Sequence, residues 1–162
     1  MKDATLCFVL HLEKRQILLG LKKRGFGAGK YNGFGGKLLS GETHRAAVLR
    51  EVHEETGLRL DGGELRPAGE ITFLFPFEPD FDHHVHVFVT SAWRGEPRES
   101  AEMAPKWFPL DGIPYERMWA DDAYWMPLVL AGKRIEATFS FGEDNERLTG
   151  WSIREAALDH HP

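Results

Sequence analysis

Three glutamates, Glu51, Glu54 and Glu55, lie within five positions of the stretch REVHEETGL. In a helix with 3.6 residues per turn, their side chains occupy an arc of roughly 100° on one side. Val48 and Val52 occupy the adjoining arc and are expected to face a core. Like charges at this spacing destabilise a helix by about a few tenths of a kcal/mol per pair. The pattern therefore indicates either a solvated acidic face or a site where a divalent cation offsets the charge.

The elements that must position these glutamates can be read from the same sequence. A helix is expected from Thr43 to Thr56, ended by Gly57, because glycine tolerates the left-handed conformation at a helix C-terminus. A glycine-rich loop, RGFGAGKYNGFGGK, precedes that helix, and a second helix contains Pro127 as a disfavoured interior residue. Strands are expected at 4–12, 16–22, 71–77, 84–93, 106–110, 135–141 and 147–153, and the second helix at 121–133. Many strands and two main helices predict an α/β fold in which helices pack on a mixed sheet.

Length and composition limit the class of protein to which this chain can belong. The chain has 162 residues, 42% of them hydrophobic and 28% charged, which suits a single soluble globular domain. Its formal net charge of −5 argues against a nucleic-acid polymer as partner, because binding a phosphate backbone favours a basic face. Cys7 is the only cysteine, so no internal disulfide can form and a cytoplasmic location is expected. The apolar stretch 6–12 is too short for a secretion signal, and no run reaches membrane-spanning length.

The stretch GKLLSGETHRAAVLREVHEETGL resembles the signature of the Nudix hydrolases in every fixed position. The matching residues are Gly36, Glu42, Arg50, Glu51, Val52, Glu54, Glu55, Gly57 and Leu58. The resemblance implies a loop–helix–loop that binds Mg²⁺ or Mn²⁺ and cleaves a diphosphate linked to another group. A divalent ion screens the charge of such a polyanion and generates hydroxide near neutral pH.

The resemblance also implies roles for individual residues of the signature. Glu51 and Glu55 are expected as direct metal ligands, and Gly36 as a backbone position that can include a carbonyl ligand. Glu54 is expected to orient or deprotonate the attacking water, or to bind a second ion. Arg50 is expected to pair with Glu42 and to fix the helix against its loop, which is a structural role.

Three further stretches, KKRGFGAGKYNGFGGK, MWADDAYWMPL and HVHVF, look like the subfamily that hydrolyses oxidised purine nucleoside triphosphates. This implies conversion of 8-oxo-dGTP and 2-hydroxy-dATP to monophosphates and pyrophosphate. It also implies an α/β/α sandwich with a mixed sheet. We expect one domain over 1–157, a disordered tail over 158–162, a monomer, and a nucleotide as the small-molecule partner, with no membrane partner.

The subfamily resemblance places a base-binding pocket around six residues. These are Asn32, Phe26, Phe73, Trp119, Asp121 and Asp122, which supply aromatic walls and polar groups for a purine edge. Other interpretations stand beside this one. Asn32-Gly33 is a turn dipeptide, Asp121 is a plausible helix N-cap with Asp122 in solvent, and Trp119 could fill core.

The sequence patterns around the remaining candidate site residues are less specific. Glu102 matches a metal-contacting loop glutamate of the family, although a solvated charge explains it nearly as well. Lys23 is favoured slightly over Lys22 for the phosphates. His84 and His86 share one strand face while His83 points away, which favours a strand surface over a metal site. His83 also departs from the family, which has an apolar pocket residue there, and would make the pocket more polar.

Two classes of function are open at this point. The first is an Mg²⁺-dependent hydrolase, acting on oxidised purine triphosphates or on methylated, undamaged or pterin triphosphates. The second is a nucleotide-binding module without catalysis. Such modules usually lack some carboxylates of the signature, and none is missing here.

Overall fold

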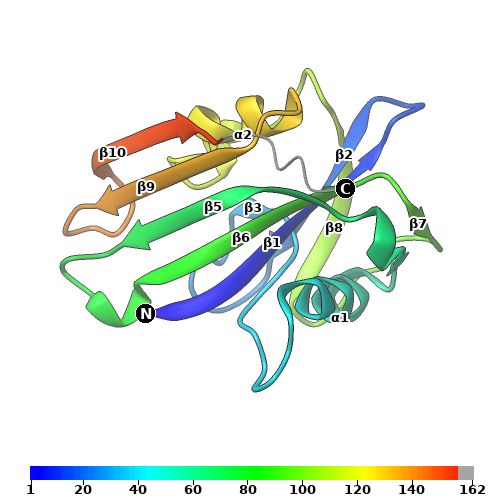
Figure 1. Ribbon diagram of the computed structural model, residues 1–162, viewed down its shortest axis with the longest axis horizontal. Coiled ribbons are helices and arrows are strands. Elements are labelled where there is room, and N and C mark those ends of the chain that lie inside the picture. The colour runs from blue at the N-terminus through cyan, green and yellow to red at the C-terminus, as the bar shows by residue number, and fades with distance from the viewer. Residues whose placement is uncertain (157–162) are drawn as a thin grey trace.

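The computed structural model describes residues 1–156, which form a mixed β-sheet with one helix packed on each face (Figure 1). The helices are α1 (His44–Thr56) and α2 (Asp122–Leu130), with short 3-10 segments η1 (Gly62–Glu64), η2 (Pro79–Phe81) and η3 (Tyr115–Arg117). The strands are β1 (Lys2–His11), β2 (Gln16–Lys22), β3 (Tyr31–Asn32), β4 (Arg59–Leu60), β5 (Arg66–Leu74), β6 (His83–Thr90), β7 (Trp93–Arg94), β8 (Met103–Pro109), β9 (Ile135–Phe141) and β10 (Leu148–Glu155).

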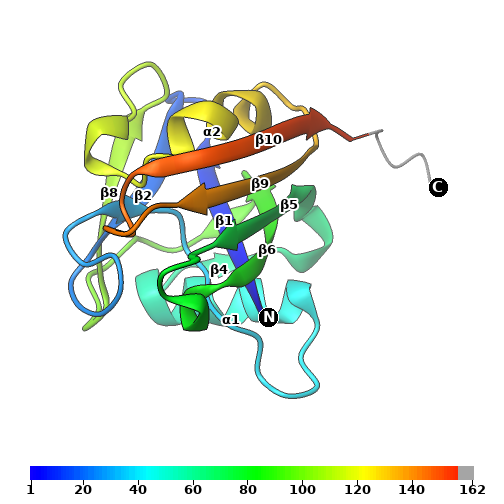
Figure 2. The same ribbon diagram turned by 90° about the vertical axis from the view of Figure 1, so that its left-hand side faces the viewer.

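The main sheet has eight strands in the order β10-β9-β5-β6-β1-β2-β3, with β8 pairing β2 beside this path. β1 and β6 are parallel, as are β5 and β9, and the remaining pairs are antiparallel. Figure 2 shows the twist of the sheet, in which β9 and β10 lie beside α2 and run at an angle to β1. The predicted mixed sheet covered by helices is confirmed.

The helix that carries the three glutamates has the predicted limits. Thr43 caps its start, because its side chain accepts a hydrogen bond from the Ala46 N–H at 3.1 Å. Gly57 ends it in the left-handed conformation, with φ of 80°. Val48 and Val52 are fully buried against Cys7 and its neighbours on the sheet. Packing of this apolar stripe fixes the rotation of the helix and, with it, the side on which the three glutamates lie.

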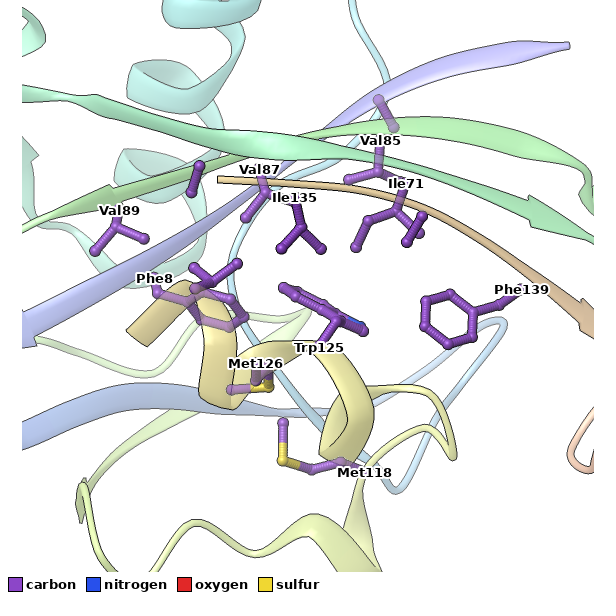
Figure 3. Packing of buried hydrophobic residues seen from close by; sticks show 14 of the residues in the cluster. Phe8, Ile71, Val85, Val87, Val89, Met118, Trp125, Met126, Ile135 and Phe139 are labelled. Atoms are coloured by element: carbon purple, nitrogen blue, oxygen red, sulfur yellow. The ribbon is translucent and has the colours of Figure 1, made fainter. Parts of the chain in front are cut away.

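The second helix packs on the other face of the sheet. Trp125 and Met126 are fully buried and meet Phe8 and Val87 of the sheet (Figure 3). The rings of Phe8 and Trp125 lie 5.7 Å apart between centroids. Pro127 lies inside this helix without ending it, and its carbonyl accepts a hydrogen bond from the Ala131 N–H at 3.1 Å. The missing N–H of Pro127 leaves one helical bond unmade.

A fork between β1 and β2 shapes the site. The two strands pair only near their connecting turn, from Val9↔Leu18 to His11↔Gln16. Beyond that point the segment 33–37 pairs with β1 instead, through the bridges Cys7↔Phe34 and Ala4↔Lys37. The fork therefore brings the end of the glycine-rich loop alongside β1 and under α1.

Several predicted strand limits need correction. The stretch 84–93 is not one strand, because β6 ends at Thr90 and β7 pairs with β4 in a separate two-stranded sheet. The strand expected at 71–77 runs instead over Arg66–Leu74. Pro76 has no N–H to donate, and the Phe75 N–H donates to the Asp82 carboxylate at 2.6 Å rather than to a strand. The strands β3 and β4 have two residues each, which is too short for an alternation of apolar and polar residues to predict them.

The prediction of one domain over 1–157 stays a prediction, and the expected tail at 158–162 lies outside the described residues. Among residues 1–156, no helix is both long and apolar enough to cross a membrane.

Candidate active site

Glu55 is the most deeply placed of the three glutamates, with 8% of its surface exposed. Its Oε1 accepts a hydrogen bond from the Gly35 N–H at 2.9 Å. Burial, and then the charge of Glu51, raise the pKa of Glu55 to about 8. Burial raises the pKa of Glu51 as well, opposed by its hydrogen bond from Arg50. Two carboxylates that resist ionisation together are stabilised in the charged form by a nearby cation.

Two glycines allow the loop to approach these carboxylates. A Cβ at Gly35 would lie 1.9 Å from the Thr5 carbonyl oxygen, inside the β1 backbone. A Cβ at Gly36 would lie 2.8 Å from Glu51 Oε1. The Gly36 carbonyl accepts a hydrogen bond from the Thr5 N–H at 2.9 Å and a longer one from the Thr5 hydroxyl at 3.5 Å. The loop backbone can therefore pass directly between β1 and the acidic face.

Arg50 holds the acidic face to the loop before α1. Its guanidinium donates to Glu42 through Nε at 2.8 Å and Nη2 at 2.9 Å. It also donates to Glu51 at 2.8 Å, to Glu54 at 3.3 Å and to the Lys37 carbonyl at 3.2 Å. The hydrogen bonds from Arg50 lower the pKa of Glu42 to about 2. The structure thus contains the ion pair expected between Arg50 and Glu42, and one guanidinium bridges helix and loop.

The donor set of this face fits a hard divalent cation. Glu51, Glu54 and Glu55 offer carboxylate oxygens, and Gly36 offers a carbonyl oxygen, with no nitrogen or sulfur ligand among them. Mg²⁺ takes a small number of carboxylates together with waters and substrate phosphates. Burial raises the pKa values of Glu51 and Glu55, and a bound cation would favour the charged form of both.

A cavity of about 240 Å³ opens beside Glu55. It extends between the sheet, α2 and the glycine-rich loop, and several expected site residues line it. These are Phe26, Asn32, Gly36, Glu55, Phe73, Trp119, Asp121 and Asp122. The carboxylate face and the expected base pocket are therefore parts of one continuous site, although they come from segments far apart in sequence.

Aromatic rings form the walls of this cavity. Phe26 is partly exposed and lies 5.0 Å from Trp119 and 5.4 Å from Phe75 between ring centroids. Phe73 stacks on His83 at 5.0 Å with an interplanar angle of 24°. Flat apolar walls with few polar groups favour a planar ring as ligand. Trp119 lines the cavity at its edge and is not a fully buried core residue.

The aspartate pair lies at the inner end of the cavity. Asp121 is 1% exposed and Asp122 is 7% exposed. Asp121 makes no side-chain capping bond to α2, and its Oδ2 accepts from Trp125 Nε1 at 2.8 Å instead. The alternative of a capping Asp121 and a solvated Asp122 is therefore wrong.

The environment of this pair disfavours two negative charges. Burial raises the pKa of Asp121, while the bond from Trp125 opposes that shift. Burial, followed by the charge of Asp121, raises the pKa of Asp122 well above its ordinary value. Such a pair holds a proton more readily than a solvated carboxylate, and a protonated carboxyl can donate a hydrogen bond.

Asn32 lies in a strand and not in a turn. It belongs to β3 and pairs with Gly20 of β2. Its Nδ2 donates to the Lys30 carbonyl at 3.3 Å, and the residue lines the cavity. The turn alternative for Asn32-Gly33 is therefore wrong.

The two remaining expected site residues are engaged at the rim. Lys23 forms an ion pair with Glu99 at 2.7 Å, whereas Lys22 lines the cavity. The structure therefore favours Lys22 over Lys23 as the lysine beside the site. Glu102 accepts from Arg24 at 2.5 and 2.8 Å, and this contact lowers the pKa of Glu102. Its negative charge nevertheless contributes to the raised pKa of Glu55, which places Glu102 near the acidic face.

Sequence reasoning missed three large cavity residues, Phe75, Trp125 and Phe141. Phe75 follows Phe73 by two positions, so strand periodicity could have found it. Trp125 follows Asp121 by four positions, which is helical neighbour spacing. Phe141 had no local signal, because its place depends on how β9 pairs with β5.

A family model of the NUDIX domain matches residues 1–129. The chain therefore belongs to the Nudix family of hydrolases, which use divalent metal ions.

Relatives of known name cover most of the chain. An oxidized purine nucleoside triphosphate hydrolase of Mus musculus is 46% identical over 147 residues, covering 91% of this chain and 92% of the relative. A Danio rerio protein of the same name is 49% identical over 136 residues, covering 84% and 85%. Among solved structures, a MutT protein from Bacillus halodurans superposes with a TM-score of 0.81 at 24% identity, over 94% of this chain and 97% of that one. The last likeness concerns the fold alone, and it confirms the Nudix-type α/β/α sandwich.

Proposed function

We propose that this protein hydrolyses oxidised purine nucleoside triphosphates, such as 8-oxo-dGTP and 2-hydroxy-dATP, to monophosphates and pyrophosphate, with Mg²⁺ as cofactor and Mn²⁺ as a possible substitute. The observation that carries this proposal is the continuity of the site. A carboxylate face suited to a divalent ion opens into an aromatic cavity that ends in two buried aspartates. The names of the Mus musculus and Danio rerio relatives support the same substrate class.

In this proposal the phosphates react at the carboxylate end of the site, and the base binds at the aromatic end. A water oxygen forms a new bond to phosphorus, the anhydride bond between the α- and β-phosphoryl groups breaks, and pyrophosphate leaves. When bound, the divalent ion screens the phosphate charge and favours hydroxide. Glu51, Glu55 and the Gly36 carbonyl would hold it, and Glu102 would approach it from the facing loop. Glu54, the most exposed of the three glutamates, is free to orient or deprotonate the water or to bind a second ion.

The other residues select and position the substrate. Trp119, Phe26 and Phe73 supply the walls for the base, and Asn32 supplies a donor and an acceptor. Asp121 and Asp122 face the base edge. We also propose that the protein acts as a monomer, and the single buried thiol of Cys7 supports a cytoplasmic location.

Turnover of a nucleotide panel tests the proposal. Pyrophosphate release is measured with 8-oxo-dGTP, 2-hydroxy-dATP, dGTP and N6-methyl-dATP, in Mg²⁺ and in excess EDTA. We expect the oxidised purines to give the highest kcat/KM and EDTA to abolish turnover. A preference for the methylated or undamaged nucleotide would replace the substrate class within the same chemistry. Tight nucleotide binding with no pyrophosphate release in Mg²⁺ would favour the binding module instead.

A further inference from the structure

A second group of ligand-type side chains lies on the α1 face of the sheet, away from the cavity. It contains Asp3 of β1, His44 at the start of α1, Glu70 of β5, and His84 and His86 of β6. The strand register explains the grouping, because His84 lies opposite Asp3 and Thr72, while His86 lies opposite Thr5 and Glu70. His83 lines the base cavity on the opposite face, as the alternation of a strand requires.

His86 lies at the centre of this group. Its Nε2 is 3.5 Å from Asp3 Oδ1 and 3.8 Å from Glu70 Oε1. Zinc with ligand bonds of about 2.0–2.2 Å separates tetrahedral ligand atoms by roughly 3.3–3.6 Å. The ligand atoms of Glu70, His84 and His86 all lie within 4.8 Å of one another, and so do those of Asp3, His44 and His86. His86 is therefore shared by two triads, each with two imidazoles and one carboxylate.

The β5–β6 triad is the better supported of the two. Its ligands stand on neighbouring antiparallel strands, whose register fixes their spacing. The Nδ1 of His84 lies 2.9 Å from Thr72 Oγ1, which leaves Nε2 directed at the Glu70 carboxylate 2.8 Å away. Metal-binding histidines commonly have such a partner on the second ring nitrogen, which sets the tautomer and the ring orientation. His44 has only its contacts with Asp3 and the His86 ring.

We propose that Glu70, His84 and His86 form a second metal site, selective for Zn²⁺ or a similar transition-metal ion and separate from the carboxylates of α1. Imidazole nitrogens suit Zn²⁺, Ni²⁺ and Cu²⁺, whereas Mg²⁺ takes oxygen ligands. The fourth position faces solvent, since each of the three side chains is between 27% and 39% exposed.

The same side chains also contact one another directly, since His84 Nε2 lies 2.8 Å from Glu70 Oε1, closer than two ligands of one zinc ion would lie. A bare network of ion pairs would hold the same side chains without a metal, so metal binding itself must be measured.

Zinc binding is measured by equilibrium dialysis and calorimetry on the full chain, with millimolar Mg²⁺ present to occupy the acidic face. We expect about one Zn²⁺ per chain and a thermal midpoint about 3–6 °C higher at zinc roughly tenfold above Kd. His84→Ala and His86→Ala should each weaken binding by at least about tenfold. Thr72→Val, which keeps all three ligands, should weaken it roughly tenfold to a hundredfold.

Control variants at histidines outside the triad test whether zinc binds at this site. His53→Ala removes an exposed histidine of α1 and should leave zinc binding unchanged, as should the double change His160→Ala with His161→Ala. Turnover in Mg²⁺ reports that each variant is folded. Full zinc binding by both His84→Ala and His86→Ala, or loss only when His160 and His161 are replaced, would overturn the proposal. Loss in His44→Ala but not in His84→Ala would overturn the assignment in favour of the other triad.

Discussion

Replacing Glu55 by glutamine separates the chemical role of this residue from its effect on stability. Glutamine has nearly the same shape, and its side-chain oxygen can still accept from the Gly35 N–H. We expect the Glu55→Gln variant to lose almost all turnover, because a proposed metal ligand is removed. We also expect the metal-free variant to be more stable than the metal-free parent protein, by a margin that grows with pH.

The sign of this margin follows from the raised pKa of Glu55. Between the ordinary pKa of 4.5 and the folded value of about 8, the unfolded chain releases a proton that the folded chain keeps. Stability of the metal-free parent therefore falls as pH rises through that window, and the loss is complete above it. Each pH unit corresponds to at most about 1.4 kcal/mol. From about pH 5.5 to about pH 7.5, the metal-free parent loses at most about 2.5 kcal/mol of unfolding free energy. With solvent relaxation, the expected loss is about 1–2.5 kcal/mol.

Chemical denaturation in EDTA at several pH values measures this effect. Glu51 and the aspartate pair also have raised pKa values, so only the difference between parent and variant isolates Glu55. Glu54→Gln is the matched control, because it removes the same charge from an exposed position. Adding Mg²⁺ should stabilise the parent more strongly at higher pH, since the ion competes with the proton. Parallel stability curves for parent and Glu55→Gln across this range would refute the reasoning.

Two further predictions concern the ion pair between Arg50 and Glu42 and the base pocket. Arg50→Ala should lower the metal-free melting temperature more than Glu54→Gln does, because Arg50 joins helix and loop while Glu54 is exposed; equal or reversed losses in melting curves would contradict the assigned roles. Asp122→Asn should weaken selection among purine triphosphates by at least roughly tenfold, the worth of about one hydrogen bond to a charged group. Asp121→Asn should shift the balance between 8-oxo-dGTP and 2-hydroxy-dATP and its pH dependence. The measurement is kcat/KM over about pH 6 to 9, and ratios that stay within about twofold would mean that the base is read elsewhere.

The carboxylate helix could be predicted closely from the sequence because its signals are local. Thr43 and Gly57 set its two ends, and Val48 and Val52 set its buried side, all within one stretch of chain. Helical spacing alone then places the glutamates on a shared face. That spacing alone favours a solvated acidic face, and only the family signature shifts the interpretation to a metal site.

The pocket was less predictable because its residues meet through long-range pairing. Phe141 reaches the cavity only because β9 lies parallel to β5, and nothing near Phe141 in sequence reports that register. Likewise, the choice between Lys22 and Lys23 depends on a partner, Glu99, about seventy-five residues away. Asp121 carried a helix-cap pattern that tertiary packing overrode, since Trp125 takes its carboxylate as a hydrogen-bond acceptor. Local propensity cannot anticipate such a competition.

The fork between β1 and β2 has a consequence for how the protein can change. A single short segment carries Asn32, which we propose for base binding, and Gly35 and Gly36 beside the carboxylates, so base binding and hydrolysis are expected to share this stretch of backbone. Elsewhere the aromatic and aspartate groups come from the loop around Phe26, from β5 and β9, and from the residues at the start of α2, whereas the acidic face belongs to α1. If the proposed roles hold, exchanging side chains on β5 or at the start of α2 should change base preference while hydrolysis is retained. Insertions within 32–36 are expected to impair base binding and hydrolysis together.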